Sequence, residues 1–339
     1  SHDCAFCTTR EYTGNEDAIV LDRAYHGNTI ATLSLSPYKF EHKGGERYKK
    51  SWVHKVKCPD CYRENIPQNG VGEHFALEVK AACRKSSAGR GGVAAFFVES
   101  GMSVAGVILP PRNYLKSAYR HVREAGGVCV ADEVQTGFGR FGESFWGFEQ
   151  QDVIPDIVTM GKPFGNGFPL AAVVTTKAIA QKFTNGLEYF NTFGGNPVAC
   201  AAGLAVLDVL EQNGMQAKAK ETGDYLKKRV VAAMHEPGGE FIGDVRGSGL
   251  FVGIEFVRNR ETREPATKEL SLLCSLLKAP PNRILTSIDG TYDNVMVIKP
   301  PMCFTKENVD TLMDAMLLIL RHIASIPSQE LEGFVPTPT

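Results

Sequence analysis

The sequence predicts an α/β protein with a mostly parallel sheet in a large domain and a smaller α+β domain at the C-terminal end. The chain has 339 residues, which is enough for two domains. Short apolar runs alternate with amphipathic segments of helical length along most of it. Several of these runs end in one polar residue followed by glycines, which is typical of buried parallel strands that deliver a side chain at their carboxyl end.

The domain boundaries follow from changes in pattern. We expect a large domain over residues 1–237 and a small domain over residues 238–325. From Gly238 the alternation gives way to two short strands around a glycine turn, within residues 241–255. The Pro-rich residues 326–339 predict a loose tail.

Composition excludes several classes of partner. Hydrophobic residues make up 43% and charged residues 22% of the chain, as in ordinary globular proteins. With 37 basic and 38 acidic residues the net charge is −1, so no basic excess points to nucleic acid or to an acidic membrane surface. No apolar run is long enough to span a bilayer, and the first residues resemble neither a signal nor a transit peptide.

The nine cysteines are scattered and odd in number, which indicates reduced thiols and not a disulfide framework. Two pairs have C-x-x-C spacing, Cys4/Cys7 and Cys58/Cys61, and together they could be read as a four-cysteine zinc site. The gap between the pairs is far longer than in a compact zinc ribbon, and Pro59-Asp60 is typical of a turn. We therefore predict no metal site.

The periodicity of apolar residues and the positions of turn residues predict the helices and strands that precede residue 127. Residues 1–16 are polar without a clear period, and residues 36–72, rich in Lys, Pro, Gly and Asn, predict an irregular surface segment. Strands are expected at residues 19–21 and 93–98, and helices at residues 73–85 and 114–125.

The elements after the centre are expected as follows. Leu170–Thr175 predicts a strand and Thr176–Phe183 a short helix. An Asn196-Pro197 start signal opens an Ala-rich helix over residues 198–213, and a second helix covers residues 215–235. In the small domain we expect a strand at residues 294–299 and a closing helix at residues 306–323.

Residues 127–169 carry the chemistry. One apolar run ends at Asp132 and the next, after Pro155, leads to Gly161-Lys162. Ligands of open α/β sheets bind outside the carboxyl ends of the strands, so these two side chains should meet at one crevice. A desolvated lysine can form a Schiff base with an aldehyde cofactor, and pyridoxal phosphate (PLP) also needs a carboxylate that keeps its ring nitrogen protonated. From spacing alone, a surface lysine and a helix-capping aspartate remain the alternative.

The sequence motifs around Asp132 and Lys162 help to decide between a PLP site and this alternative. The motifs are Ala131-Asp132-Glu133-Val134-Gln135-Thr136-Gly137-Phe138-Gly139-Arg140, Gly161-Lys162 and Asn196-Pro197. They resemble the class III aminotransferase family of fold type I PLP enzymes, and the similarity runs from about Asp17 to about Leu320. The resemblance implies a PLP-binding enzyme with the same fold.

The resemblance also implies roles for single residues. Lys162 holds the cofactor and Asp132 faces its ring nitrogen; both are the expected catalytic residues. Tyr25 stacks on the ring opposite Val134, and Gln135 bonds the ring hydroxyl. The remaining predicted cofactor-binding residues are His26, which shapes the wall, Glu99 at the end of a strand, and Thr192 in a Thr-x-Gly-Gly turn. In the family this threonine reaches the PLP phosphate of the neighbouring subunit, which implies a homodimer, or a tetramer built from dimers.

Two departures from the family pattern are visible. Family members carry a segment and a Gly-Ser turn before the region that matches residue 10, and the turn binds the PLP phosphate at a helix N-terminus. Nothing in residues 1–10 resembles it, so we expect the N-terminal part of the family fold to be absent. In the motif after Glu99 the second acid is replaced by Val104, and Val297 stands where transaminases place an Arg for the α-carboxylate. Lys299 lies two residues further on the same strand face.

These departures favour a substrate without the usual α-carboxylate. The segments 36–40, 189–192 and 298–305 are similar to the phospho-lyase branch of the family, which acts on ethanolamine phosphate or 5-phosphohydroxylysine. Our hypothesis is a phospho-lyase that takes a phosphorylated amine, with Arg140 and Lys39 as partners of the substrate phosphate. The alternatives are a transaminase, which needs a keto-acid acceptor, and an inactive chain that acts only as a subunit. The resemblance implies a mitochondrial location, with the cytoplasm as the alternative.

Overall fold

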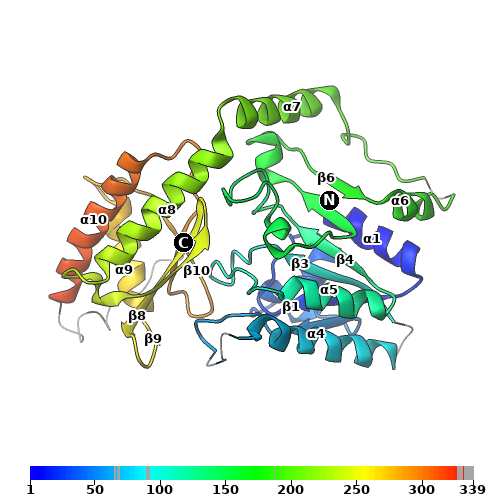
Figure 1. The fold of residues 1–339 in the computed structure, drawn as a ribbon, viewed down its shortest axis with the longest axis horizontal. Helices are drawn as coiled ribbons and strands as arrows, with labels where there is room; N and C mark the ends of the chain where they lie inside the picture. Colours follow the sequence, from blue (N-terminus) through cyan, green and yellow to red (C-terminus); the bar gives the residue numbers. More distant parts are fainter. Residues whose placement is uncertain (65, 67–68, 89–91, 187, 327–330, 332–339) are drawn as a thin grey trace. The chain divides into compact units, whose positions relative to one another are not determined.

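The structure is a computed structural model, and it describes residues 1–64, 66, 69–88, 92–186, 188–326 and 331 (Figure 1). These residues form two compact units. Unit 1 consists of Ser1–Met102, Leu109–Phe138 and Ser144–Asn213. Unit 2 consists of Ser103–Ile108, Gly139–Glu143 and the residues from Gly214 onward.

Unit 1 contains a six-stranded sheet in the order β2-β1-β3-β4-β5-β6. The strands are β1 (Asp17–Leu21), β2 (Val53–Val56), β3 (Val93–Glu99), β4 (Val128–Asp132), β5 (Ile157–Met160) and β6 (Ala172–Thr175). Strands β1 to β5 pair in parallel, and only β6 runs antiparallel to its neighbour β5. The predicted mostly parallel sheet is therefore confirmed.

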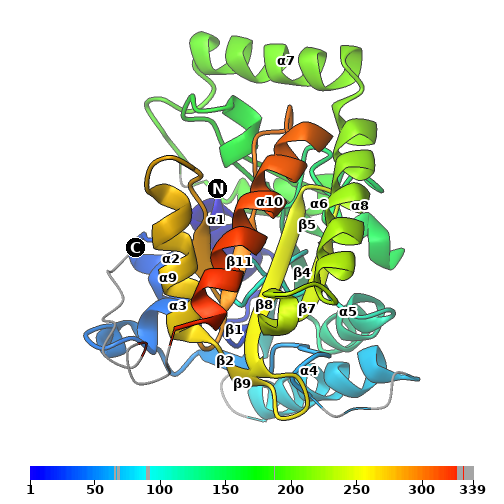
Figure 2. The same ribbon diagram turned by 90° about the vertical axis from the view of Figure 1, so that its left-hand side faces the viewer.

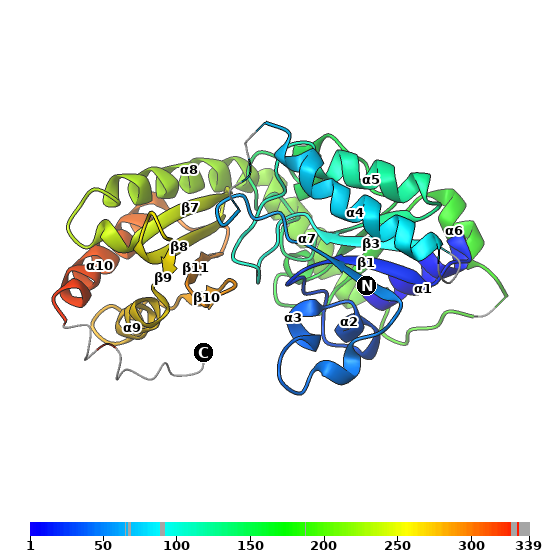
Figure 3. The same cartoon turned by 90° about the horizontal axis from the view of Figure 1, so that it is seen from below.

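Helices lie on both faces of this sheet. Helices α4 (Val71–Ser87) and α5 (Tyr114–Glu124) cover one face, and α1 (His2–Thr13) packs on the other (Figure 3). Strands β3 and β4 are buried along their whole length between these layers, which explains why they consist almost only of apolar residues. The remaining elements of the unit are α2 (Ile30–Ser34), α3 (Pro37–Phe40), η1 (Glu46–Tyr48), η2 (Gly147–Gln151), η3 (Lys162–Gly165), α6 (Lys177–Phe183) and α7 (Pro197–Gln212).

Helix α7 begins where the sequence predicts. The Asn196 side-chain oxygen accepts a hydrogen bond from the Ala199 N–H at 2.9 Å, and Pro197 occupies the first helical position. Figure 1 shows α7 apart from the sheet of its unit, and only Ala199 and Gly203 of this helix are buried. Most of this apolar helix is therefore exposed in the single chain.

Unit 2 is built on an antiparallel sheet in the order β10-β11-β8-β7, with β9 paired to β8. Helices α8, α9 and α10 pack around this sheet and bury one apolar core (Figure 2). The strands are β7 (Ile242–Ser248), β8 (Phe251–Asn259), β9 (Glu264–Pro265), β10 (Ser287–Asp289) and β11 (Val295–Ile298). The helices are α8 (Met215–Ala233), η4 (Gly239–Phe241), α9 (Thr267–Lys278) and α10 (Lys306–Ala324).

Three parts of the chain differ from the prediction. Residues 2–13 form helix α1, whose buried residues His2, Ala5, Phe6 and Thr9 recur at helical spacing. The periodicity is weak in the sequence because two of these four side chains are polar. The segment 36–72 contains edge strand β2 as well as short helices, and α9 and β10 were not predicted.

The boundary between the units also differs from the prediction. The long C-terminal segment of unit 2 begins at Gly214 and not at residue 238, and two short earlier segments also belong to this unit. The reason is that α8 contributes Leu226, Val230 and Ala233 to the core of unit 2, so the helix packs with the sheet that follows it. Most of the predicted tail lies outside the described residues, although Leu331 is buried in the same core.

Candidate active site

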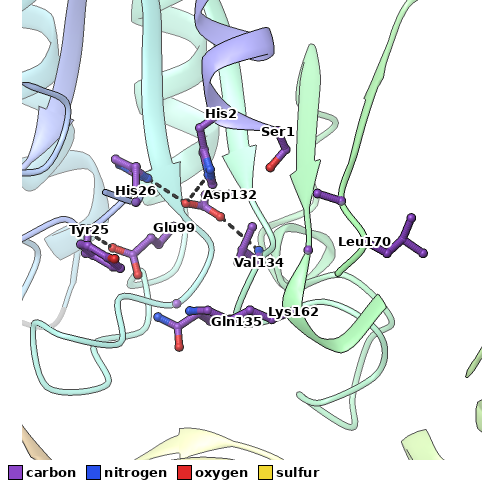
Figure 4. Close-up of a pocket in the computed structure, with 14 residues that line it drawn as sticks. Ser1, His2, Tyr25, His26, Glu99, Asp132, Val134, Gln135, Lys162 and Leu170 are labelled. Carbon is purple, nitrogen blue, oxygen red and sulfur yellow. Dashed lines mark hydrogen bonds and ion pairs between the residues drawn. The ribbon is translucent and has the colours of Figure 1, made fainter. Parts of the chain in front are cut away.

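A cavity of about 240 Å³ lies in unit 1 at the carboxyl ends of the parallel strands (Figure 4). Asp132 ends β4, Glu99 ends β3, and Gly161-Lys162 follows β5. The residues that line the cavity are Ser1, His2, Tyr25, His26, Gly27, Glu99, Gly101, Asp132, Val134, Gln135, Gly161, Lys162, Leu170 and Ala171. The structure thus brings Asp132 and Lys162 to one crevice, together with every predicted cofactor-binding residue except Thr192.

Asp132 is buried and held by three donors. Its Oδ2 atom lies 2.7 Å from His2 Nε2 and 2.8 Å from His26 Nδ1, and its Oδ1 atom accepts the Val134 N–H at 3.1 Å (Figure 4). Burial by itself would raise the pKa of this carboxyl, but His2 and His26 outweigh it and hold the pKa well below its usual range. The two histidines therefore favour the ionised form of Asp132 inside the cavity.

Lys162 lines the same cavity from a strained backbone. Its φ angle is 34°, in the left-handed region that non-glycine residues seldom adopt, and it opens the short helix η3. The side chain is exposed, which corrects the expectation of a desolvated lysine. The cause is local, because residues 166–169 of the following loop are exposed as well and leave this side of the cavity open.

Tyr25 stands at the wall of the cavity. Its backbone N–H donates to Glu99 Oε1 at 3.0 Å, so the buried Glu99 fixes the turn after β1. The Tyr25 ring packs edge-to-face against Tyr38, and Lys39 Nζ lies 5.6 Å from its centroid. Glu99 thus holds the backbone of the tyrosine that the family places on the cofactor ring.

Val134 and Gln135 line the cavity from the turn after β4, and Glu133 anchors that turn. Glu133 is fully buried; its Oε2 accepts from Thr136 Oγ1 at 2.6 Å and from the Gly147 N–H at 3.0 Å. Burial raises the pKa of Glu133, and the hydrogen bonds oppose this shift. No role was predicted for Glu133, although it is adjacent to Asp132.

Four predicted anion-binding residues are not among those that line this cavity, and of these Lys39 lies near Tyr25 at its wall. Thr192 is exposed in the turn before α7. Arg140 belongs to unit 2, where its Nη1 donates to the carbonyls of Leu250 at 3.0 Å and Pro300 at 2.8 Å. These bonds give Arg140 a structural role, and Lys299 Nζ likewise donates to Ser103 Oγ at 2.6 Å within unit 2.

The His2–His26–Asp132 cluster is also the group of described residues that has metal-ligand spacing. The separations of 2.7 and 2.8 Å are those of charge-assisted hydrogen bonds to an ionised carboxylate, and we interpret them so. Neither C-x-x-C pair belongs to a group with such spacing among the described residues, and all nine thiols are free.

The donor set of the cavity fits PLP. A buried anion suits a protonated ring nitrogen, an amine suits the aldehyde, and Tyr25 and Val134 offer flat and apolar surfaces for the ring. The phosphate end is less complete in this chain, since the predicted phosphate residue Thr192 lies outside the cavity.

Two lining residues were missed at the start of the chain, Ser1 and His2. The spacing of His2, Phe6 and Thr9 on one helical face was the available signal. Leu170 was also missed; it lies between the loop after Lys162 and strand β6.

Comparisons with known proteins agree with this geometry. The model of the family "Aminotransferase class-III" matches residues 4–320. An alanine–glyoxylate aminotransferase 2-like protein of Drosophila melanogaster is 48% identical over 319 residues, 92% of this chain. A Caenorhabditis elegans protein named ethanolamine-phosphate phospho-lyase homolog 1 is 40% identical over 340 residues, covering 95% of this chain and 72% of its own.

A solved structure is similar as well. A phospholyase from Arthrobacter in complex with phosphoethanolamine superimposes with a TM-score of 0.86 and 35% identity, covering 96% of this chain and 75% of that chain. This chain spans 64% of the length of the fly relative. The family match covers most of the chain, and the cavity, the carboxylate and the lysine lie within it. The chain therefore belongs to the class-III aminotransferase family, whose members depend on PLP.

Proposed function

We propose that the protein is a PLP-dependent phospho-lyase that removes phosphate from a phosphorylated amine, with ethanolamine phosphate as the first candidate. The observation that carries the proposal is that Asp132, held by His2 and His26, lies in the same cavity as Lys162. The similarity to the worm protein named as a phospho-lyase homolog and to the phosphoethanolamine complex from Arthrobacter supports the choice of substrate class.

Each of the main residues of the cavity has a separate role in the proposed reaction. When bound, PLP supplies an electron sink for negative charge that develops on the substrate carbon. Lys162 Nζ would hold the cofactor at rest and then accept the proton from the carbon that bears the amine. Asp132 would place its charge at the ring nitrogen, Gln135 would bond the ring hydroxyl, and Tyr25 and Val134 would confine the two ring faces.

The overall reaction balances without a second organic substrate. Ethanolamine phosphate and water give acetaldehyde, phosphate and ammonia. Loss of the carbon-bound proton to Lys162 allows the C–O bond of the neighbouring carbon to break, with phosphate as the leaving group. A transaminase, in contrast, must pass the amine to a keto acid.

The uncharged residues at positions 104 and 297 favour the lyase over the transaminase. Val297 is buried in β11 and offers no cation for an α-carboxylate. The backbone carbonyl of Val104, at the position of the missing acid, accepts the Gly290 N–H at 3.1 Å. A substrate that ends in phosphate does not require the missing arginine.

Lys39 is our candidate for the substrate phosphate within unit 1. Its Nζ lies 5.6 Å from the ring centroid of Tyr25 and 5.2 Å from that of Tyr38, so the ammonium group stands beside the wall of the cavity. Among the residues that the structure describes, no carboxylate forms an ion pair with it. Its charge is available to an anion.

Phosphate release is the test. Purified protein with PLP and ethanolamine phosphate, and no keto acid, is expected to release phosphate and acetaldehyde in equal amounts. Lys162→Ala should release neither, and Lys39→Met should raise KM more than it lowers kcat. Turnover that appears only after a keto acid is added would identify the transaminase, which the name of the fly relative also supports. No turnover in either assay would favour the inactive subunit.

We further propose a homodimer. The apolar side chains Phe190 and Phe193 of the turn that carries Thr192, and Val198, Leu204 and Val209 of α7, are exposed; we call them the α7 face. Gly203, on the buried side of α7, packs against Phe164 of η3 and Leu170 of the cavity, so α7 lies beside the loop that follows Lys162. A second copy on this face would cover the exposed lysine. The mitochondrial location implied by the family resemblance stays a prediction.

A further inference from the structure

We propose that His2 is a positioning residue for Asp132, and that its hydrogen bond keeps the carboxylate charged and oriented for the ring nitrogen of the cofactor. This inference rests on the proposed function, because it assigns a role in the same site. Nothing in the motifs around Lys162 and Asp132 points to His2, which lies 130 residues before its partner.

The geometry of the contact carries the proposal. His2 Nε2 lies 2.7 Å from Asp132 Oδ2, and an ionised carboxylate only accepts, so this ring nitrogen donates. Both side chains are nearly buried, with exposed fractions of 11% for His2 and 5% for Asp132. Figure 4 shows His2 and His26 converging on the same oxygen, while Val134 N–H holds the other.

The place of His2 in the fold strengthens the argument. His2 occupies the first turn of α1, and that turn brings the positive end of the helix dipole towards Asp132. His2 Nε2 also lies 3.1 Å from Thr159 Oγ1 on β5, the strand that leads to Lys162. Asp132 and Thr159 are paired residues of neighbouring strands. One imidazole therefore links the strand ends that deliver the two expected catalytic residues.

A purely structural role is the competing interpretation, and the chain offers a matched control for it. His54 Nε2 lies 2.7 Å from Asp17 Oδ2 in the same unit, with exposed fractions of 13% and 5%. This pair is away from the residues that line the cavity. His2→Leu and His54→Leu therefore each remove one buried histidine from an aspartate, but only the first lies at the cavity.

The experiment compares the parent with His2→Leu, His2→Gln and His54→Leu. Each protein is loaded with PLP, followed by its visible absorption, and assayed for phosphate release from ethanolamine phosphate. His2→Leu should lower kcat by about 10- to 100-fold with little change in KM, since a hydrogen bond to a charged group is lost. His2→Gln, whose side-chain N–H can replace the donor, should stay within about 3-fold of the parent. His54→Leu should leave kcat unchanged.

A second measurement does not depend on the cofactor. Urea unfolding of the protein without PLP, for the parent, His2→Gln, His2→Leu, Asp132→Asn and the double variants, gives the coupling between the two side chains. His2→Leu should lower the unfolding constant much less when Asp132 is already Asn. If His2→Leu does not fold, His2→Ala, which also removes the donor, takes its place in the cycle.

The outcomes separate the two proposals. A parent that binds PLP through Lys162, with parent-like kcat in His2→Leu, overturns the role of His2. The role is also overturned if His2→Gln is as impaired as His2→Leu, or if the unfolding effects simply add. A parent that never attaches PLP defeats the proposed function, and the unfolding cycle alone then decides whether His2 holds Asp132.

Discussion

Asp132 and Lys162 differ in burial and in the number of groups that hold their side chains. The carboxylate is built into the sheet, buried, and surrounded by donors from α1, from the turn after β1 and from its own turn. Lys162 has a strained backbone conformation, and its side chain is exposed. The anion is thus pre-organised within one chain, whereas the amine is exposed in that chain.

The charge on Asp132 is testable by an isosteric change. Asp132→Asn keeps the shape of the side chain but removes the charge that the ring nitrogen requires. We expect phosphate release to fall by about 10²- to 10³-fold while PLP still attaches to Lys162, as judged by absorption. Asp17→Asn, at the other buried histidine–aspartate pair, is the control and should retain turnover. Equal losses in the two variants would contradict the role given to Asp132.

Sequence reasoning reaches some of these residues and not others. Asp132 and Lys162 are predictable because each follows an apolar run and precedes glycines, a local signal. His2 is not, because its partner lies far along the chain and the buried stripe of α1 mixes polar and apolar residues. Thr192 was placed by resemblance alone, and the single chain leaves it outside the cavity.

Among the strands and helices, the sheet of unit 2 contains a carboxyl group, Asp289, whose charged form is disfavoured by burial. Asp289 ends the edge strand β10, and burial raises its pKa to about 6, with Lys299 opposing the shift and Asp293 adding to it. The folded state therefore prefers the protonated carboxyl. Its contribution to stability is complete below about pH 4 and is lost as the pH rises through about 6.

Asp289→Asn should remove this loss. The free energy of unfolding of the variant, measured by urea at pH values from 4 to 7, should gain on that of the parent as the pH rises. The same substitution at the exposed Asp208 of α7 serves as the control and should show no comparable gain. A difference between parent and Asp289→Asn that does not change with pH would contradict the prediction.

The elements were predictable where their periodicity was strong. The buried strands β3 and β4 and the helices α4, α5 and α10 agree with the prediction to within a few residues. Edge strand β2 was missed because it lies in a polar segment and only its last residue is buried. The boundary at Gly214 was missed because packing of α8 on unit 2, and not a change of composition, determines it.

For the molecule as a whole, we expect the α7 face to form the contact of the proposed homodimer. Leu204 lies on this face with an exposed fraction of 63%. Leu204→Glu should shift the protein from dimer to monomer in sedimentation and lower turnover, because a charge would be buried in the contact. Leu318→Glu, at an equally exposed position of α10 with 66%, should leave the dimer intact. A parent that sediments as a monomer would contradict the homodimer.

The fold of the whole chain was predictable because its motifs extend over nearly all of it, as the match over residues 4–320 confirms. Two properties could not be derived in this way. The exposure of Lys162 depends on which surfaces cover the cavity, and the choice between lyase and transaminase depends on how a substrate is held. Neither property leaves a periodic signal in one sequence.

We expect Lys162 to bind PLP in the cavity that contains Asp132. The most direct measurement is reduction of the PLP-treated protein with borohydride, followed by mass spectrometry of its peptides. We predict that the stable pyridoxyl group is found on Lys162, that Lys162→Ala does not acquire it, and that Lys39→Met still does. Labelling of other lysines with Lys162 unmodified, or no labelling at all, would contradict the account.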